Sequence, residues 1–244
     1  MDDFHAALAA AVRDAGGKGV GTLGEKTLHL ALKYYFAPDP GTHERPVGGF
    51  IADAVTEEGI IEIQTRGLSR LRRKLAAFLP VCPVTVVFPV AEEKWLMRVD
   101  EAGELRSKRR SPKHESLYTA VREIYTLRDY LTNPRLTVCL CRLSIAEYIL
   151  GSDRRSRRRL DRVPLALQGI TELRTPADYA ALLPDALPEP FTVKELRGLT
   201  GQNEMLGGIL VNLLARVGCV MQCGMRGRQK LWTRTECVSD VIRR

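Results

Sequence analysis

The sequence lacks any long apolar run, and no stretch approaches the ~20 consecutive apolar residues that a transmembrane helix requires. Its first residues, Met1-Asp2-Asp3-Phe4-His5, are acidic where a secretory signal is basic. It also lacks a Cys-x-x-Cys pair, and its 4 histidines show no paired metal spacing. These absences argue against a membrane protein, a secreted protein and a zinc site. We expect a cytoplasmic protein whose 6 cysteines are mostly buried free thiols.

Basic residues exceed acidic ones, and the formal net charge of +8 indicates a polyanionic partner. The excess is unevenly distributed. Residues 191–244 carry 9 Lys and Arg against 4 Asp and Glu, whereas residues 1–190 carry 28 against 25. The C-terminal part is therefore the more basic one per residue.

The segment Pro184-Asp185-Ala186-Leu187-Pro188-Glu189-Pro190 contains 3 prolines in 7 residues and predicts a linker without regular structure. A chain of 244 residues suits either one large domain or one domain plus a small module. The sequence thus predicts a domain over 1–184 and a second one over 190–244.

Hydrophobic periodicity in the first domain predicts alternating helices and strands, which is typical of the α/β class. Residues 154–159, rich in arginine, are expected to form a loop. The expected helices cover 3–14, 23–36, 68–79 and 117–131, and the expected strands cover 43–47, 50–55, 60–65, 84–89, 95–99, 104–108, 136–143 and 163–167.

Two of these strands each carry one acid inside an apolar run. Asp53 lies in Phe50-Ile51-Ala52-Asp53-Ala54-Val55, and Glu62 lies in Gly59-Ile60-Ile61-Glu62-Ile63-Gln64-Thr65. A buried acid costs several kcal/mol (about 2–7) unless a partner compensates it, so such acids concentrate at metal and catalytic sites. The residues between the two runs, 56–59, read as a turn. The runs therefore form a hairpin on which Asp53 and Glu62 can meet, with Gln64 on the same face as Glu62.

This order of helix, strands and acids resembles the PD-(D/E)XK, or restriction-endonuclease-like, nuclease superfamily over residues 22–90. The matching positions are Glu25, Asp53, Glu62 and Gln64. The resemblance implies an α/β fold with a mixed central sheet flanked by helices. It also implies that Asp53 and Glu62 bind Mg²⁺ (or Mn²⁺), that Glu25 assists, and that the site hydrolyses phosphodiesters. Gln64 stands where the family has a lysine, and a glutamine carries no charge. The whole chain also resembles an uncharacterised bacterial family, which adds no chemistry.

The missing positive charge has three candidate substitutes nearby, Lys26, Arg66 and Lys74. The basic face of helix 68–79, with Arg70, Arg73 and Lys74, is expected to contact the DNA backbone, although a solvated face is the alternative.

Each acid also has a structural alternative. Glu25 completes a capping box with Thr22. Asp53 could be an exposed acid on a half-solvated strand, and Glu62 could pair with Arg45 or Arg66.

Past the linker, Thr192-Val193-Lys194-Glu195 forms a capping box, a turn covers 198–201, and a longer helix follows over 203–217. A hairpin with the basic tip Gly224-Met225-Arg226-Gly227-Arg228 comes last. This order resembles the winged-helix family. The resemblance implies that Gln202 and Asn203 open a recognition helix and that Arg226, Arg228 and Lys230 lie on the wing. Protein contact or dimerisation is the alternative use of such a module.

The sequence therefore predicts a Mg²⁺-dependent, DNA-directed nuclease delivered by a winged helix. A catalytically inactive DNA-binding regulator with the same fold is the second hypothesis, and a protein–protein adaptor is the third. A homodimer is compatible with cleavage of both DNA strands, which requires two sites.

Overall fold

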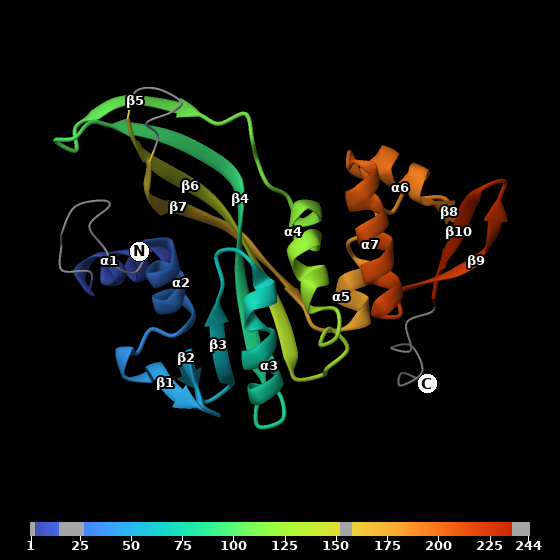
Figure 1. Cartoon of the computed structure of the whole chain (residues 1–244), viewed down its shortest axis with the longest axis horizontal. Helices are drawn as coiled ribbons and strands as arrows, with labels where there is room; N and C mark the ends of the chain where they lie inside the picture. Colours follow the sequence, from blue (N-terminus) through green and yellow to red (C-terminus); the bar gives the residue numbers. More distant parts are fainter. Residues whose placement is uncertain (1–2, 15–26, 152–157, 236–244) are drawn as a thin grey trace.

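A mixed seven-stranded sheet forms the centre of the computed structural model, which describes residues 3–14, 27–151 and 158–235 (Figure 1). Its parallel centre is β3–β4–β6, and the remaining pairs are antiparallel. This architecture confirms the predicted α/β class. The strands lie in the order β1 (His43–Val47), β2 (Phe50–Thr56), β3 (Gly59–Ile63), β4 (Val84–Val99), β6 (Leu136–Leu150) and β7 (Arg158–Leu173), and β5 (Leu105–Arg110) pairs with β4.

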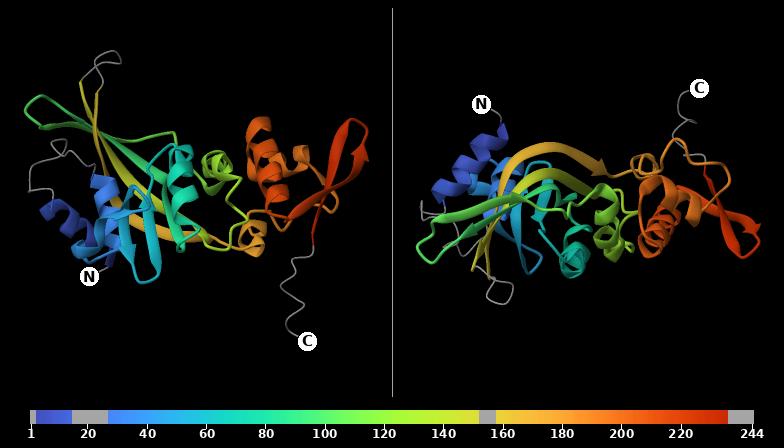
Figure 2. Two further views of the ribbon diagram at one scale, coloured as in Figure 1. Left: turned by 60° about the horizontal axis from the view of Figure 1, so that its bottom comes forward. Right: turned by 90° about the horizontal axis from the view of Figure 1, so that it is seen from above.

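Helices cover both faces of this sheet (Figure 2). α1 (Asp3–Asp14) and α2 (Thr27–Phe36) lie on one face, and α3 (Arg72–Phe78) and α4 (Leu117–Ile124) lie on the other. The inner half of β4 is buried on both sides: Val86 belongs to the cluster with α3 and α4, and Val87 to the cluster with α2. A strand covered on both faces needs a continuous apolar run, which is what residues 84–88 supply.

The hairpin predicted around the two acids is present. Ala54 pairs with Ile61 and Thr56 with Gly59. Gly59 has a φ of +133°, and a Cβ at this position would lie 2.4 Å from the carbonyl oxygen of Pro83. Only glycine fits this close approach between the turn and the start of β4.

Several elements differ from the sequence expectation, among them β6, which continues to Leu150 where the expected strand ends at 143. β4 is one strand of 16 residues rather than two, and β7 covers 158–173 where a loop and a short strand were expected. Pro164 and Gly169 read as breaks, but β7 is an edge strand whose register shifts beside both residues, and edges tolerate such residues. Helix 117–131 is also shorter than expected, because α4 ends at Ile124 and a 3₁₀ turn (Tyr125–Leu127) follows.

The C-terminal part has two helices followed by a hairpin, in the order that the sequence predicts. The predicted capping box is formed, since Thr192 and Glu195 bond reciprocally at the start of α6. A three-stranded sheet in the order β8–β10–β9 completes this part. After β7 the chain forms a short helix, α5 (Pro176–Ala180), which precedes the segment 184–190. The C-terminal part then consists of β8 (Phe191–Thr192), α6 (Val193–Thr200), α7 (Glu204–Arg216), β9 (Val220–Arg226) and β10 (Gln229–Arg234).

Residues 184–190 have no helix or strand, but they are packed against their neighbours. Leu187 is buried in the same apolar cluster as α4 and α7. The Glu189 carboxylate accepts hydrogen bonds from the backbone N–H and the guanidinium of Arg234, at 2.7 and 2.9 Å. Arg216 of α7 donates to the carbonyl oxygen of Arg128 at 3.2 Å. The apolar core therefore continues from the central sheet into the C-terminal part.

Two further expectations concern cysteines and membranes. Cys139 and Cys141 are buried free thiols, as expected, and Cys219 is buried, whereas Cys223 is exposed on β9. Its side chain faces solvent because β9 is a surface strand of the C-terminal hairpin. Within the described ranges, no helix has the length and apolar character that crossing a membrane would require.

The shared core predicts that both halves of the chain unfold together. The chain has 2 tryptophans, Trp95 on β4 and Trp232 on β10, so the variants Trp232→Phe and Trp95→Phe each report one half by fluorescence. We expect the two urea transitions to have the same midpoint, because one continuous buried cluster joins the halves. Two well-separated midpoints would show that the C-terminal part is an independent unit.

Candidate functional site

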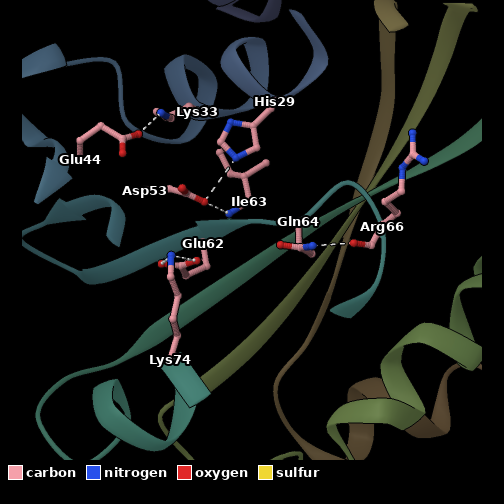
Figure 3. A network of polar contacts seen from close by, with 9 residues as sticks. All are labelled: His29, Lys33, Glu44, Asp53, Glu62, Ile63, Gln64, Arg66 and Lys74. Carbon is pink, nitrogen blue, oxygen red and sulfur yellow. Dashed lines mark hydrogen bonds and ion pairs between the residues drawn. The ribbon is translucent and has the colours of Figure 1, made fainter. Parts of the chain in front are cut away.

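A polar hollow of about 490 Å³ lies at the end of β3, where side chains from four elements meet (Figure 3). Asp53 comes from β2, Glu62 from β3, Lys74 from α3 and His29 from α2. The structure thus brings together the two acids that the sequence places on neighbouring strands.

Asp53 lies where β2 and β3 separate. The paired register begins at Ala54 and Ile61, and beyond it the Asp53 carboxylate accepts a hydrogen bond from the backbone N–H of Ile63 at 2.7 Å. The Nε2 atom of His29 lies 3.4 Å from the same oxygen. Burial raises the pKa of Asp53, but the contacts with His29 and Ile63 and the charge of Lys74 outweigh it, so the pKa lies below its ordinary value. Asp53 is therefore an ionised carboxylate at neutral pH.

Glu62 is almost fully buried, with 1% of its surface exposed. Ile61 and Ile63 point to the opposite face of β3, so Glu62 faces α3, where the Nζ atom of Lys74 lies 2.9 Å from each of its carboxylate oxygens. Burial and the negative charge of Asp53 raise the pKa of Glu62 to about 7, against the opposing effect of Lys74. The alternative role of Glu62, an ion pair with Arg45 or Arg66, is not the one formed, because the partner of Glu62 is Lys74.

Gln64 lines the same hollow, but its side chain is hydrogen-bonded within the turn that follows β3. Its side-chain amide donates to the carbonyl oxygen of Arg66 at 2.5 Å, and its backbone N–H bonds to Val87 at 3.0 Å. The positive charge beside the acids therefore comes from helix α3 and not from β3 (Figure 3). Of the three substitutes considered, Lys74 contacts Glu62, Arg66 lines the hollow, and Lys26 lies outside the described residues.

The other predicted residues of this region have different positions. Glu25 lies outside the described residues. Arg70 lines the hollow, whereas the guanidinium of Arg73 lies 6.0 Å from the ring centre of Phe50 and does not line it. His29 was missed by the sequence reasoning. Its signal was the spacing of four residues from Glu25, which places both on one face of the expected helix.

The predicted DNA-contact residues of the C-terminal part divide into two groups. Asn203 caps α7 by accepting from the N–H of Leu206 at 2.9 Å, and the Gln202 amide donates to the carbonyl oxygen of Thr200 at 3.0 Å. On the hairpin, Arg226 pairs with Glu195 at 2.7 Å. Arg228 and Lys230 are exposed side chains at and beside the hairpin turn.

The donors at the hollow suit a hard cation. Mg²⁺ is commonly held by one or two carboxylates together with waters and substrate phosphate, and Asp53 and Glu62 offer two carboxylates. Across the described ranges, no group of three or more His, Cys, Asp and Glu side chains is arranged to hold a metal ion. The site therefore fits a Mg²⁺ ion that keeps open positions, and it does not fit a closed structural metal.

Comparisons with other proteins place this site inside a shared domain. Residues 26–174 match a domain of unknown function, DUF8091. An uncharacterized protein of Treponema pallidum (strain Nichols) is 36% identical over 220 residues, which cover 87% of this chain and 86% of the relative. No solved structure matches. The matched domain contains β1 to β7 with Asp53, Glu62 and Lys74, and the chain belongs to the DUF8091 family.

Proposed function

We propose that this protein is a Mg²⁺-dependent, DNA-directed nuclease of the PD-(D/E)XK type, with its reaction centre at Asp53 and Glu62. One observation carries the proposal: the buried carboxylate of Glu62 and the partly buried carboxylate of Asp53, on neighbouring strands, converge on one hollow, and the Lys74 ammonium lies 2.9 Å from both oxygens of Glu62. Two acids where two strands separate and a lysine from the facing helix α3 are groups that metal-assisted phosphodiester hydrolysis can use.

Each residue has a role that follows from its contacts. Bound Mg²⁺ would neutralise charge on the phosphate and lower the pKa of water. Asp53 and Glu62 would hold it, and the Ile63 N–H fixes the orientation of Asp53. Lys74 stands beside Glu62 and supplies the positive charge that Gln64 does not, so its ammonium can stabilise charge on the phosphate. Arg66 and Arg70, on the rim, can hold flanking phosphates.

The C-terminal part would act as a winged helix that binds DNA. Two helices and a hairpin support this assignment, and the exposed cations Arg228 and Lys230 occupy the position of a wing. Asn203 and Gln202 would contact DNA only at the expense of their bonds at the start of α7. The cations of the hairpin are therefore the better-supported DNA contacts.

The second candidate is a DNA-binding protein that keeps the nuclease fold without activity. The Glu62–Lys74 pair favours it, because both carboxylate oxygens already have a cationic partner and the charge of the buried acid is balanced without metal. This candidate predicts DNA binding without cleavage under any divalent cation.

The first test is cleavage of single- and double-stranded DNA with Mg²⁺ or Mn²⁺. We expect Asp53→Asn and Glu62→Gln each to reduce the rate by about 10²-fold or more, because each removes a charge that the transition state requires. We also expect Mn²⁺ to raise the Tm of the wild type by binding to these carboxylates, and both variants should lose this rise. Glu57→Gln, in the exposed turn of the same hairpin, is the matched control and should behave as wild type. Equal rates in all four proteins would place the reaction centre elsewhere.

The raised pKa of Glu62 gives a test in the absence of metal. A carboxyl whose folded pKa, about 7, exceeds its ordinary value of 4.5 stabilises the fold when protonated, so this contribution is lost as the pH rises from 4.5 to about 7. In EDTA, we expect the stability of wild type relative to Glu62→Gln to fall between about pH 5 and about pH 8 by on the order of 3 kcal/mol. Urea unfolding at several pH values measures this difference. A difference that does not vary with pH would contradict the assigned pKa.

Salt dependence tests the wing. Each phosphate contact adds about 0.9 to the slope of log affinity against log salt concentration for duplex DNA. We expect Arg228→Ala and Lys230→Ala each to reduce this slope by about 1 and to weaken binding similarly for unrelated sequences. Arg13→Ala, which removes an exposed cation on α1, is the control. Unchanged slopes in both hairpin variants would favour a protein-contact role for this part.

A further inference from the structure

A second charged pocket, of about 360 Å³, lies next to the carboxylate site, between α4 and the long strands β4, β6 and β7. Thr65 and Arg66 line both hollows, so the turn after β3 separates them. The pocket is rich in cations, which are Arg66, Lys94, Arg122, Arg159 and Arg162.

Three acids line the same pocket, and each is already engaged. Glu115 accepts from the N–H of Ala91 at 2.9 Å, and Glu123 accepts from the N–H of Leu68 at 2.9 Å. Glu147 is shared between two cations: it lies 3.1 Å from the Nε atom of Arg159 and 4.0 Å from the Nζ atom of Lys94. Five cations against three acids leave an excess of about two positive charges in the pocket.

Arg162 has a buried side-chain donor that a ligand in this pocket could satisfy. Its Nε is buried and has no hydrogen-bond partner in the described part of the chain. Burial lowers the pKa of Arg162; Glu115 and Glu147 oppose this effect, and the nearby charges of Arg159 and Arg66 add to it. The guanidinium groups of Arg66, Arg159 and Arg162 repel one another, and the acids of the pocket offset this repulsion only in part.

We propose that this pocket binds the terminal phosphate of a DNA strand and so anchors a strand end beside the carboxylates. Guanidinium groups match phosphate oxygens with paired hydrogen bonds. A phosphate monoester carries about −1.5 to −2 charges at pH 7, which balances the excess in the pocket, whereas a phosphodiester within the strand carries one. The inference rests on the proposed nuclease function, and it defines the substrate as DNA with a phosphorylated end.

The test measures binding in EDTA, where no metal-dependent cleavage occurs. One single-stranded oligonucleotide is prepared with a 5′-phosphate, with a 3′-phosphate or with hydroxyls at both ends. We expect one phosphorylated form to bind about 10-fold or more tightly than the hydroxyl form. Inorganic phosphate should compete with the terminal phosphate for the pocket and so reduce this difference in affinity. Arg159→Gln and Arg162→Gln should remove the preference, so that each variant binds the phosphorylated and hydroxyl forms with equal affinity. Arg158→Gln, an exposed neighbour on β7 that does not line the pocket, should keep it.

Circular dichroism checks the fold of each variant, and if Arg162→Gln is unfolded, Arg122→Gln replaces it. Equal affinity for all three oligonucleotides would overturn the inference, as would a preference that survives in both Arg159→Gln and the second pocket variant. Competition by inorganic phosphate without any end preference would also overturn it, because the pocket would then take free phosphate.

Binding by Asp53→Asn separates the inference from the proposed function, because we expect this variant to keep the end preference. If the wild-type protein prefers a phosphorylated end but cleaves no DNA, only the nuclease proposal is overturned. If it cleaves DNA without such a preference, only the proposed phosphate-binding role of the pocket is overturned.

Discussion

The buried carboxylate of Glu62 constrains how α3 packs against β3 and which side chains line the hollow between them. A charged acid with 1% exposure would cost several kcal/mol (about 3–5) if its partner were removed, so α3 must keep Lys74 within reach of β3. That position of α3 also places Arg70 on the rim of the same hollow. A metal ion bound at this carboxylate would compete with the ammonium of Lys74. The balance between these two cations therefore decides whether the site is closed by an internal ion pair or open to substrate.

The hairpin of Asp53 and Glu62 could be predicted because its signals are local: alternating apolar residues, a turn sequence, and a glycine at the turn. The partner of Glu62 could not. The predicted helix over 68–79 is in fact a 3₁₀ turn (Leu68–Leu71) followed by α3. Each 3₁₀ residue advances about 120° around the axis instead of about 100°, so the faces of the following helix are rotated relative to a continuous α-helix. Which of its cations faces the sheet depends on this rotation and on packing.

The full lengths of β4, β6 and β7 escaped prediction for a different reason, although the segments 95–99 and 163–167 were expected to be strands. Beyond the part of the sheet that helices cover on both sides, burial no longer selects a continuous apolar run, and charged residues interrupt the pattern (Figure 1). Hydrogen bonds between neighbouring strands then maintain the sheet where side-chain patterning does not. The same region carries Glu147, Arg159 and Arg162. The stretch with the weakest strand signal is therefore the one that builds the cationic pocket.

Helix α4 links this pocket to the C-terminal part. Its exposed side provides Arg122 and Glu123 to the pocket, and its apolar side, with Val121 and Ile124, belongs to the buried cluster that continues into α7. A continuous buried cluster holds α4 and α7 in fixed relative positions, because closely packed side chains cannot slide past one another without leaving cavities. A DNA strand held at the pocket and a duplex held at the hairpin would thus be fixed relative to each other by one helix, and no flexible linker would set the distance between them.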